Sequence, residues 1–174
     1  GMHLRDVANR AEGVQIVCAA DLGGVNFDRL RADGVAVYDD FVAMLKAEAP
    51  DIAIVATPIA THYAVARRVL DFPLAGLYLE KSMATRLSEA DELVTVAAGA
   101  NIRFVVGHQL RYARGWADAR NMIDSGMVGD VQFIRGRRGA ALLTHHTHQT
   151  DLMRYYLDDT PASWVIGQAH RDGS

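Results

Sequence analysis

The sequence lacks several features that would place it in a specialised class of protein. It contains a single cysteine, Cys18, so no disulfide can form within the chain, and the apolar run around it predicts a buried, inert thiol. It has no apolar stretch of the roughly 18 residues that a transmembrane helix needs, and its start has no apolar segment typical of a signal peptide. It also has no basic block, and its formal net charge of -3 does not favour nucleic-acid binding. We therefore expect a cytoplasmic protein that has neither a membrane nor a nucleic acid as its partner.

The apolar residues that are present suffice for a folded core. The 174 residues are 50% hydrophobic and 22% charged, which is typical of one globular domain, or of one domain and part of another. Short apolar runs alternate with segments of helical periodicity, and this alternation predicts βαβ units in a parallel sheet. The expected strands are 14–20, 35–38, 52–56, 74–79 and 102–106, and the expected helices are 3–12, 26–32, 41–48, 61–71 and 88–98. Because the run 52–56 is apolar throughout, it predicts a strand that is buried on both faces.

The pattern changes after residue 110. It predicts two longer helices, at 112–125 and 145–157, and two further strands, at 131–137 and 163–168. The first of these strands alternates apolar and polar residues, as in a sheet with one wet face. We therefore expect a doubly wound α/β domain over residues 1–110 and the beginning of an α+β domain over residues 111–174.

An acid and a base follow the apolar run at 74–79. Glu80 and Lys81 are expected at the carboxyl end of a parallel strand, where open α/β sheets bind their ligands. Two charged residues at a strand end can equally be ordinary solvated side chains. Position alone leaves both interpretations open.

Five short motifs follow one another along the chain, and each of them alone is a weak signal. They are Ile54-Val55-Ala56-Thr57-Pro58 with His62, then Glu80-Lys81, Gly107-His108-Gln109-Leu110-Arg111-Tyr112, Gly129-Asp130-Val131, and Thr147-His148-Gln149-Thr150-Asp151-Leu152-Met153. In this order the motifs resemble those of the Gfo/Idh/MocA family of nicotinamide-dependent sugar and polyol oxidoreductases. The resemblance covers nearly the whole chain. It implies hydride transfer between NAD and a sugar, a polyol or a related small hydroxy compound.

The resemblance also implies roles for individual residues. Lys81 and His148 are the candidate catalytic residues, because an amine or an imidazole can carry the proton of a substrate hydroxyl as hydride leaves. The residues implied in cofactor binding are Asp21, Thr57, Pro58, His62 and Glu80. Those implied in substrate binding are His108, Arg111, Thr144 and Asp151.

Asp21 indicates NAD rather than NADP. A carboxylate at the end of the strand at 14–20 can accept hydrogen bonds from the hydroxyls of the adenosine ribose. The next residue, Leu22, is not the arginine that a 2′-phosphate would need. The alternative is a strand-end aspartate that serves only as a turn or cap residue.

The run His145-His146-Thr147-His148 allows a second interpretation as a zinc site, because closely spaced histidines can bind zinc when they share one face. We favour a histidine-rich helix start at a substrate pocket, with no metal. Asp151 lies three residues after His148 and shares its helix face, so it can orient the imidazole or contact the substrate.

Three departures from the family pattern affect these expectations. Ser82 stands where the family usually has the proline that fixes the turn presenting the lysine, and Thr144 stands where it often has an aspartate. Family members also begin with a strand and a G-x-G-x-x-G turn, whereas this chain begins inside the following helix and stops at Ser174. The expected fold is therefore a Rossmann-like sheet without its first strand and Gly-rich loop, and NAD binding by the chain itself should be weak.

Two classes of function follow from these expectations. The first is an NAD-dependent sugar or polyol dehydrogenase. The second is a catalytically inactive, truncated remnant that acts as a binding or interaction module. In both cases unpaired strand edges predict a homodimer or a higher homo-oligomer.

Overall fold

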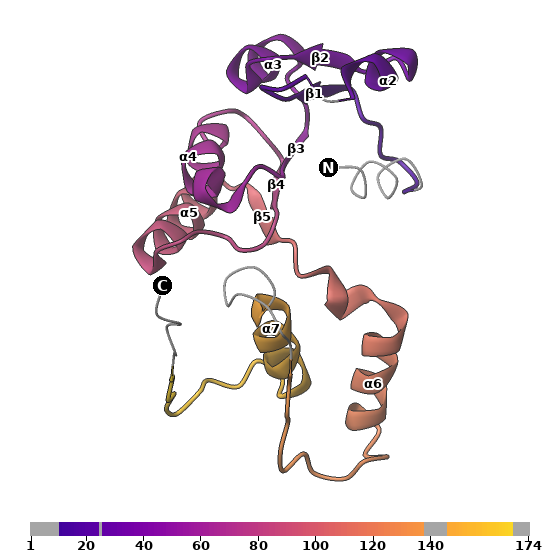
Figure 1. The fold of residues 1–174 in the computed structure, drawn as a ribbon, viewed down its shortest axis with the longest axis vertical. Helices are drawn as coiled ribbons and strands as arrows, with labels where there is room; N and C mark the ends of the chain where they lie inside the picture. Colours follow the sequence, from indigo (N-terminus) through magenta and orange to yellow (C-terminus); the bar gives the residue numbers. More distant parts are fainter. Residues whose placement is uncertain (1–10, 25, 138–145, 169–174) are drawn as a thin grey trace, which may run out of the picture. The chain divides into compact units, whose positions relative to one another are not determined.

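The computed structural model describes residues 11–24, 26–137 and 146–168 (Figure 1). The chain divides into two compact units, residues 1–107 and 108–174, and each is described by itself. No helix of the described residues has the length and hydropathy that a membrane span requires. The expected helix at 3–12 falls mostly outside the described residues.

Unit 1 consists of alternating strands and helices, as the sequence predicts. Their bounds are β1 (Cys18–Ala20), α2 (Phe27–Ala32), β2 (Ala36–Tyr38), α3 (Phe41–Glu48), β3 (Ile52–Val55), α4 (Ile59–Val69), β4 (Gly76–Leu79), α5 (Leu87–Gly99) and β5 (Arg103–Val106). Every strand pairing among the described residues is parallel. The expected Rossmann-like α/β class is therefore confirmed, although β1 is shorter than the expected strand at 14–20.

The strands form two sheets. β1 pairs with β2, and β3, β4 and β5 form a second sheet with β4 in its centre. In a Rossmann-like sheet a further strand lies between these two groups, and the described residues contribute no strand at that place. Within the described residues, β1 and β3 each have one unpaired edge.

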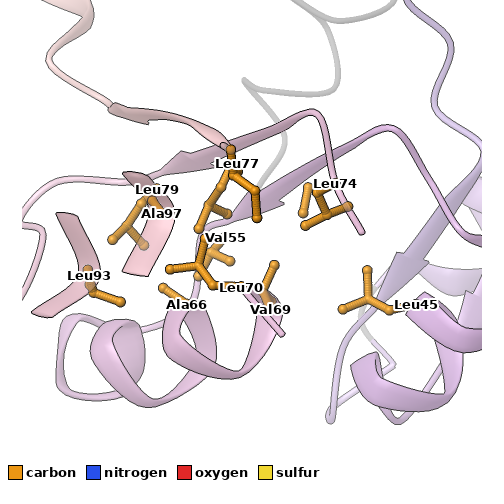
Figure 2. Close-up of a cluster of buried hydrophobic side chains, with 12 residues drawn as sticks. Leu45, Val55, Ala66, Val69, Leu70, Leu74, Leu77, Leu79, Leu93 and Ala97 are labelled. Atoms are coloured by element: carbon orange, nitrogen blue, oxygen red, sulfur yellow. The ribbon is translucent and has the colours of Figure 1, made fainter. Parts of the chain in front are cut away.

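The core of unit 1 lies between the three-stranded sheet and helices α4 and α5. Figure 2 shows Val55, Leu77 and Leu79 on the side of the sheet that faces these helices. Leu79 of β4 and Leu93 of α5 are both fully buried, at 0% exposure. Burial of apolar side chains in this layer is the main stabilising contribution to the unit.

The opposite face of this sheet is open within the described residues. Ile52 and Ile54 of β3 are 56% and 47% exposed, and Val105 of β5 is 47% exposed. The prediction that the run 52–56 is buried on both faces is therefore wrong. An uninterrupted apolar run is consistent with burial on one face as well as on two, so the pattern alone could not separate them.

Short loops connect the strands to the helices. The carboxylate of Asp40 accepts a hydrogen bond from the backbone N–H of Val42 at 2.8 Å and so caps the start of α3. Ala49, in the left-handed conformation with φ of 40°, and then Pro50 end that helix. Pro58 precedes the first residue of α4, where the lack of a backbone N–H costs nothing.

In the described part of unit 2 the chain forms a 3₁₀ turn, η1 (Gln109–Tyr112), and two helices, α6 (Arg114–Asp124) and α7 (Thr147–Tyr156). The strands expected at 131–137 and 163–168 are not present, so both predictions are wrong. A strand is held by hydrogen bonds to a neighbouring strand, and neither segment has such a partner among the described residues.

Candidate functional site

Three loops of unit 1 leave the same edge of the three-stranded sheet. Leu79 at the end of β4 is in register with Val55 of β3 and Val106 of β5. Because the strands are parallel, the residues that follow them emerge side by side. These residues are Thr57 and Pro58 after β3, Glu80 and Lys81 after β4, and Gly107 after β5.

Tyr78 lies across Gly107 at this edge. A Cβ atom placed on Gly107 would lie only 2.5 Å from the Tyr78 hydroxyl oxygen, so only glycine fits without displacement. Burial, and to a smaller extent the charge of Glu80, raises the pKa of the Tyr78 hydroxyl. Tyr78 is therefore a neutral phenol beside the charged loop.

Glu80 and Lys81 form a short, partly buried segment after β4. The backbone N–H of Lys81 donates a hydrogen bond to Oε2 of Glu80 at 3.2 Å. The peptide bond between Lys81 and Ser82 is cis. Ser82 itself is only 7% exposed, so the loop passes below the surface directly after the lysine.

His62 of α4 lies beneath both loops. Its side chain is 1% exposed. Its Nδ1 lies 2.7 Å from the carbonyl oxygen of Ser82, and its Nε2 lies 2.7 Å from the carbonyl oxygen of Thr57. The imidazole thus joins the loop after β3 to the loop after β4.

Asp21 follows β1 directly and is exposed. Its Oδ1 accepts a hydrogen bond from the backbone N–H of Gly23 at 2.8 Å, the geometry of an Asx turn. Among the described residues no group donates a hydrogen bond to its other carboxylate oxygen. Asp21 is thus a turn residue that still presents one acceptor oxygen to solvent.

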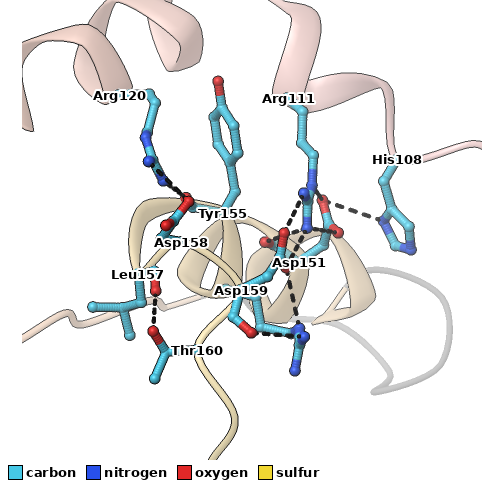
Figure 3. Close-up of polar contacts among 10 residues, drawn as sticks. His108, Arg111, Arg120, Asp151, Tyr155, Leu157, Asp158, Asp159 and Thr160 are labelled. Carbon is cyan, nitrogen blue, oxygen red and sulfur yellow. Dashed lines mark hydrogen bonds and ion pairs between the residues drawn. The ribbon is translucent and has the colours of Figure 1, made fainter. Parts of the chain in front are cut away.

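Unit 2 gathers four more of the predicted site residues. Figure 3 shows Arg111 of η1 against Asp151 of α7. The guanidinium holds this carboxylate through two bonds, Nε to Oδ2 at 2.9 Å and Nη2 to Oδ1 at 2.8 Å. Its Nη1 also donates to Asp159 at 3.0 Å, and these two carboxylates raise the pKa of Arg111.

The two histidines of this group lie next to each other. The rings of His108 and His148 meet edge to face, with centroids 5.5 Å apart. Nδ1 of His108 lies 3.9 Å from Oδ2 of Asp151 (Figure 3). His148 is 8% exposed and lies in the first turn of α7. Thr144, the remaining predicted substrate residue, lies outside the described residues.

The sequence interpretation missed Asp159, Tyr155 and Arg120. Asp159 is the second carboxylate on Arg111, and Tyr155 carries the guanidinium groups of both Arg111 and Arg120 over its ring, at 5.2 and 5.4 Å from the centroid. The sequence shows two adjacent acids after α7, Asp158 and Asp159, and in the structure both accept hydrogen bonds from arginine side chains. Nothing in the sequence pattern indicated the stacked arginines.

No group of three or more histidine, cysteine or acidic side chains that could hold a metal ion occurs in the described part of the chain. An apolar groove of about 560 Å³ runs beside α6, between Met122, Ile123, Val128, Phe133 and Tyr156. None of the predicted site residues lines this groove.

Both a protein-family model and individual known proteins match this chain. Residues 1–108 match the model of an oxidoreductase family with an NAD-binding Rossmann fold, Gfo/Idh/MocA. The chain is 25% identical over 177 aligned residues to inositol 2-dehydrogenase from Salmonella paratyphi B, which covers 90% of this chain and 51% of that enzyme. The chain therefore spans about half the length of the relatives it matches.

Solved structures share the fold. Myo-inositol 2-dehydrogenase from Lactobacillus plantarum superimposes with a TM-score of 0.79 at 22% identity, over 88% of this chain and 52% of that one. Scyllo-inositol dehydrogenase from Lactobacillus casei, solved with bound NAD(H) and scyllo-inositol, gives a TM-score of 0.79 at 19% identity, over 89% and 52%. At these identities the likeness shows the fold alone.

Proposed function

Because the chain belongs to the Gfo/Idh/MocA family of NAD-binding oxidoreductases, we propose that it serves in NAD-dependent oxidation of a polyol or a sugar. The observation that carries the proposal is the common edge at which β3 and β4 end. Parallel register delivers Thr57, Pro58, Glu80 and Lys81 to that edge. Ligands of open α/β sheets bind at the carboxyl ends of the strands.

The residues at the end of β1 fit a dinucleotide. Asp21 has an exposed carboxylate with one oxygen directed to its own turn and one open to a ligand, which suits a ribose diol. The adjacent Leu22 is 96% exposed and apolar, so it offers no charge to a 2′-phosphate. These features support NAD in preference to NADP. Thr57, Pro58 and Glu80 stay proposed cofactor contacts.

The proposed chemistry assigns acid–base roles to Lys81 and His148. When bound, NAD supplies the acceptor for the hydride. Lys81 holds the substrate oxygen, and its amine, when neutral, can receive the proton of the substrate hydroxyl. His148, with its ring packed against His108, is the second proposed acid–base group.

The substrate class rests on hydrogen-bonding capacity and on the relatives. His108, Arg111 and Asp151 form a polar cluster on η1 and α7, and adjacent hydroxyl groups of a polyol can exchange hydrogen bonds with such a cluster. Arg111 and Asp151 are already bonded to each other, so Asp151 would contact a substrate from a fixed orientation. The relatives named as inositol 2-dehydrogenases make a cyclic polyol the first compound to test.

The test is NADH formation from a panel of inositols, linear polyols and hexoses, with NAD binding measured separately by calorimetry. We expect turnover with at least one cyclic polyol, and His148→Asn should lower kcat by about 10²-fold. NAD binding without turnover of any compound would instead support the inactive binding module.

A further inference from the structure

The side chain of His62 is placed to hold the loop that carries Lys81. Each of its ring nitrogens lies 2.7 Å from a carbonyl oxygen, and the two oxygens belong to loops that follow neighbouring strands. A carbonyl oxygen only accepts hydrogen bonds, so a ring nitrogen bonds to its carbonyl oxygen when it carries the proton, and a neutral imidazole carries that proton on one nitrogen at a time. The ring is 1% exposed, which leaves it without access to a cofactor or substrate.

The two bonds have different consequences. Thr57 has other ties to α4, since Thr61 Oγ1 lies 3.0 Å from Thr57 Oγ1 and donates to the carbonyl oxygen of Pro58 at 2.8 Å. Ser82 directly follows Lys81 and is 7% exposed, so its carbonyl oxygen needs a donor inside the protein. The Nδ1 bond therefore acts on the segment that presents Lys81.

We propose that His62 is a positioning residue, whose Nδ1 bond to the Ser82 carbonyl fixes the backbone that presents Lys81. This replaces the expected direct contact of His62 with the cofactor by a role through the loop. The proposal that His62 fixes this loop rests on geometry alone. The proposal that the fixed loop matters for catalysis rests on the proposed function.

Two substitutions distinguish the contributions of the two ring nitrogens of His62. The side-chain amide nitrogen of asparagine lies close to the position of Nδ1, and that of glutamine lies close to the position of Nε2. His62→Asn therefore keeps a donor for Ser82 and loses the one for Thr57, whereas His62→Gln does the reverse. Tyr63→Phe is the matched control, because it removes one hydrogen bond, to Glu92, from the adjacent position of the same helix.

The measurement is amide hydrogen exchange in the peptide that contains Lys81, Ser82 and Met83, recorded on the full chain. We expect His62→Gln to speed exchange there by about tenfold, while His62→Asn and Tyr63→Phe stay close to the wild type. If both His62 variants match the wild type, or if both accelerate exchange equally, the proposal is overturned.

Steady-state kinetics of the same variants test the catalytic consequence. We expect His62→Gln to lower kcat with little change in the KM for NAD, and His62→Asn to retain most of kcat. If the loop responds as expected but the wild type turns over no polyol, the proposed function fails and the positioning role stands. If the variants have wild-type kcat despite a loosened loop, the catalytic part of the inference is overturned.

Discussion

Arg111 holds Asp151 through both oxygens of the carboxylate, with N–O distances of 2.9 and 2.8 Å. The bond joins η1 to α7, 40 residues apart in sequence. The two side chains are 24% and 14% exposed, so water screens the pair only partly. Arg111 is therefore a structural connection within unit 2 as well as a predicted substrate residue.

We expect Arg111→Ala to lower the free energy of unfolding of unit 2 by about 2 kcal/mol, because it leaves a mostly buried carboxylate without its partner. Both tryptophans of the chain, Trp116 and Trp164, lie in this unit, so urea unfolding followed by tryptophan fluorescence reports on it. Arg114→Ala is the control, since the Arg114 side chain is 96% exposed and its Nε lies 3.8 Å from Oδ2 of Asp118. Equal unfolding midpoints for the two variants would contradict the expectation.

Asp159 gives unit 2 a dependence on acid pH. Its hydrogen bond to Arg111 is the main cause that lowers its pKa below the ordinary value of 3.8. A carboxylate with a lowered folded-state pKa stabilises the protein above its unfolded-state pKa, and this stabilisation is lost as pH falls through the lowered value. We expect the unfolding midpoint of Asp159→Asn to fall less steeply below about pH 4 than that of the wild type. Asp118→Asn, at an exposed aspartate, should follow the wild type, and superimposable curves for all three proteins would refute the assignment.

Gly107 should not tolerate a side chain. We expect Gly107→Ala to destabilise unit 1 by about 2 kcal/mol, because its Cβ would lie 2.5 Å from the Tyr78 hydroxyl. Adding Tyr78→Phe should recover part of this loss, since the substitution removes the nearest atom. Gly99→Ala, where the new Cβ would meet nothing within 4 Å beyond the adjoining backbone of its own helix, is the control, and circular dichroism during thermal unfolding provides the comparison. Gly107→Ala and Gly99→Ala with the same midpoint would show that Tyr78 has room to move.

Most of unit 1 could be predicted from the sequence. The helix expected at 41–48 is α3, and the strand expected at 52–56 is β3 shortened by one residue. These elements are specified by local signals, namely apolar periodicity, the Asp40 cap and prolines at helix boundaries. The strands predicted at 131–137 and 163–168 are absent because a strand needs a neighbouring strand to pair with. A local sequence pattern does not show whether such a neighbour exists.

The sequence suggested candidate site residues but not the contacts between them. Motif order led to the prediction of Lys81, His108, Arg111 and Asp151 as site residues, yet no spacing rule indicates that Arg111 bonds to Asp151. The sequence likewise did not indicate that His62 is buried, because a histidine in an amphipathic helix can face either the core or a ligand. These relationships depend on side chains far apart in sequence.

The exposed sheet face predicts self-association. Ile52, Ile54 and Val105 form an apolar surface on β3 and β5, and β3 also has an unpaired edge within the described residues. We expect light scattering to give a mass above that of the 19.0 kDa chain, and Ile54→Lys to shift it toward the monomer. Leu22→Lys is the control, because Leu22 is also apolar and is 96% exposed but does not belong to the three-stranded sheet. It should leave the mass measured by light scattering unchanged. A monomer mass for the wild type at all concentrations would contradict this expectation.

The most direct test of the proposed dehydrogenase is the rate of NADH formation by Lys81→Met, compared with Lys46→Met, on the best substrate of the polyol panel. Both substitutions remove one lysine charge, but Lys46 lies exposed on α3, away from the loops that follow β3 and β4. The proposed role of Lys81 predicts a kcat lowered by about 10²-fold or more in Lys81→Met and a wild-type kcat in Lys46→Met. A wild-type kcat in Lys81→Met would contradict the assignment.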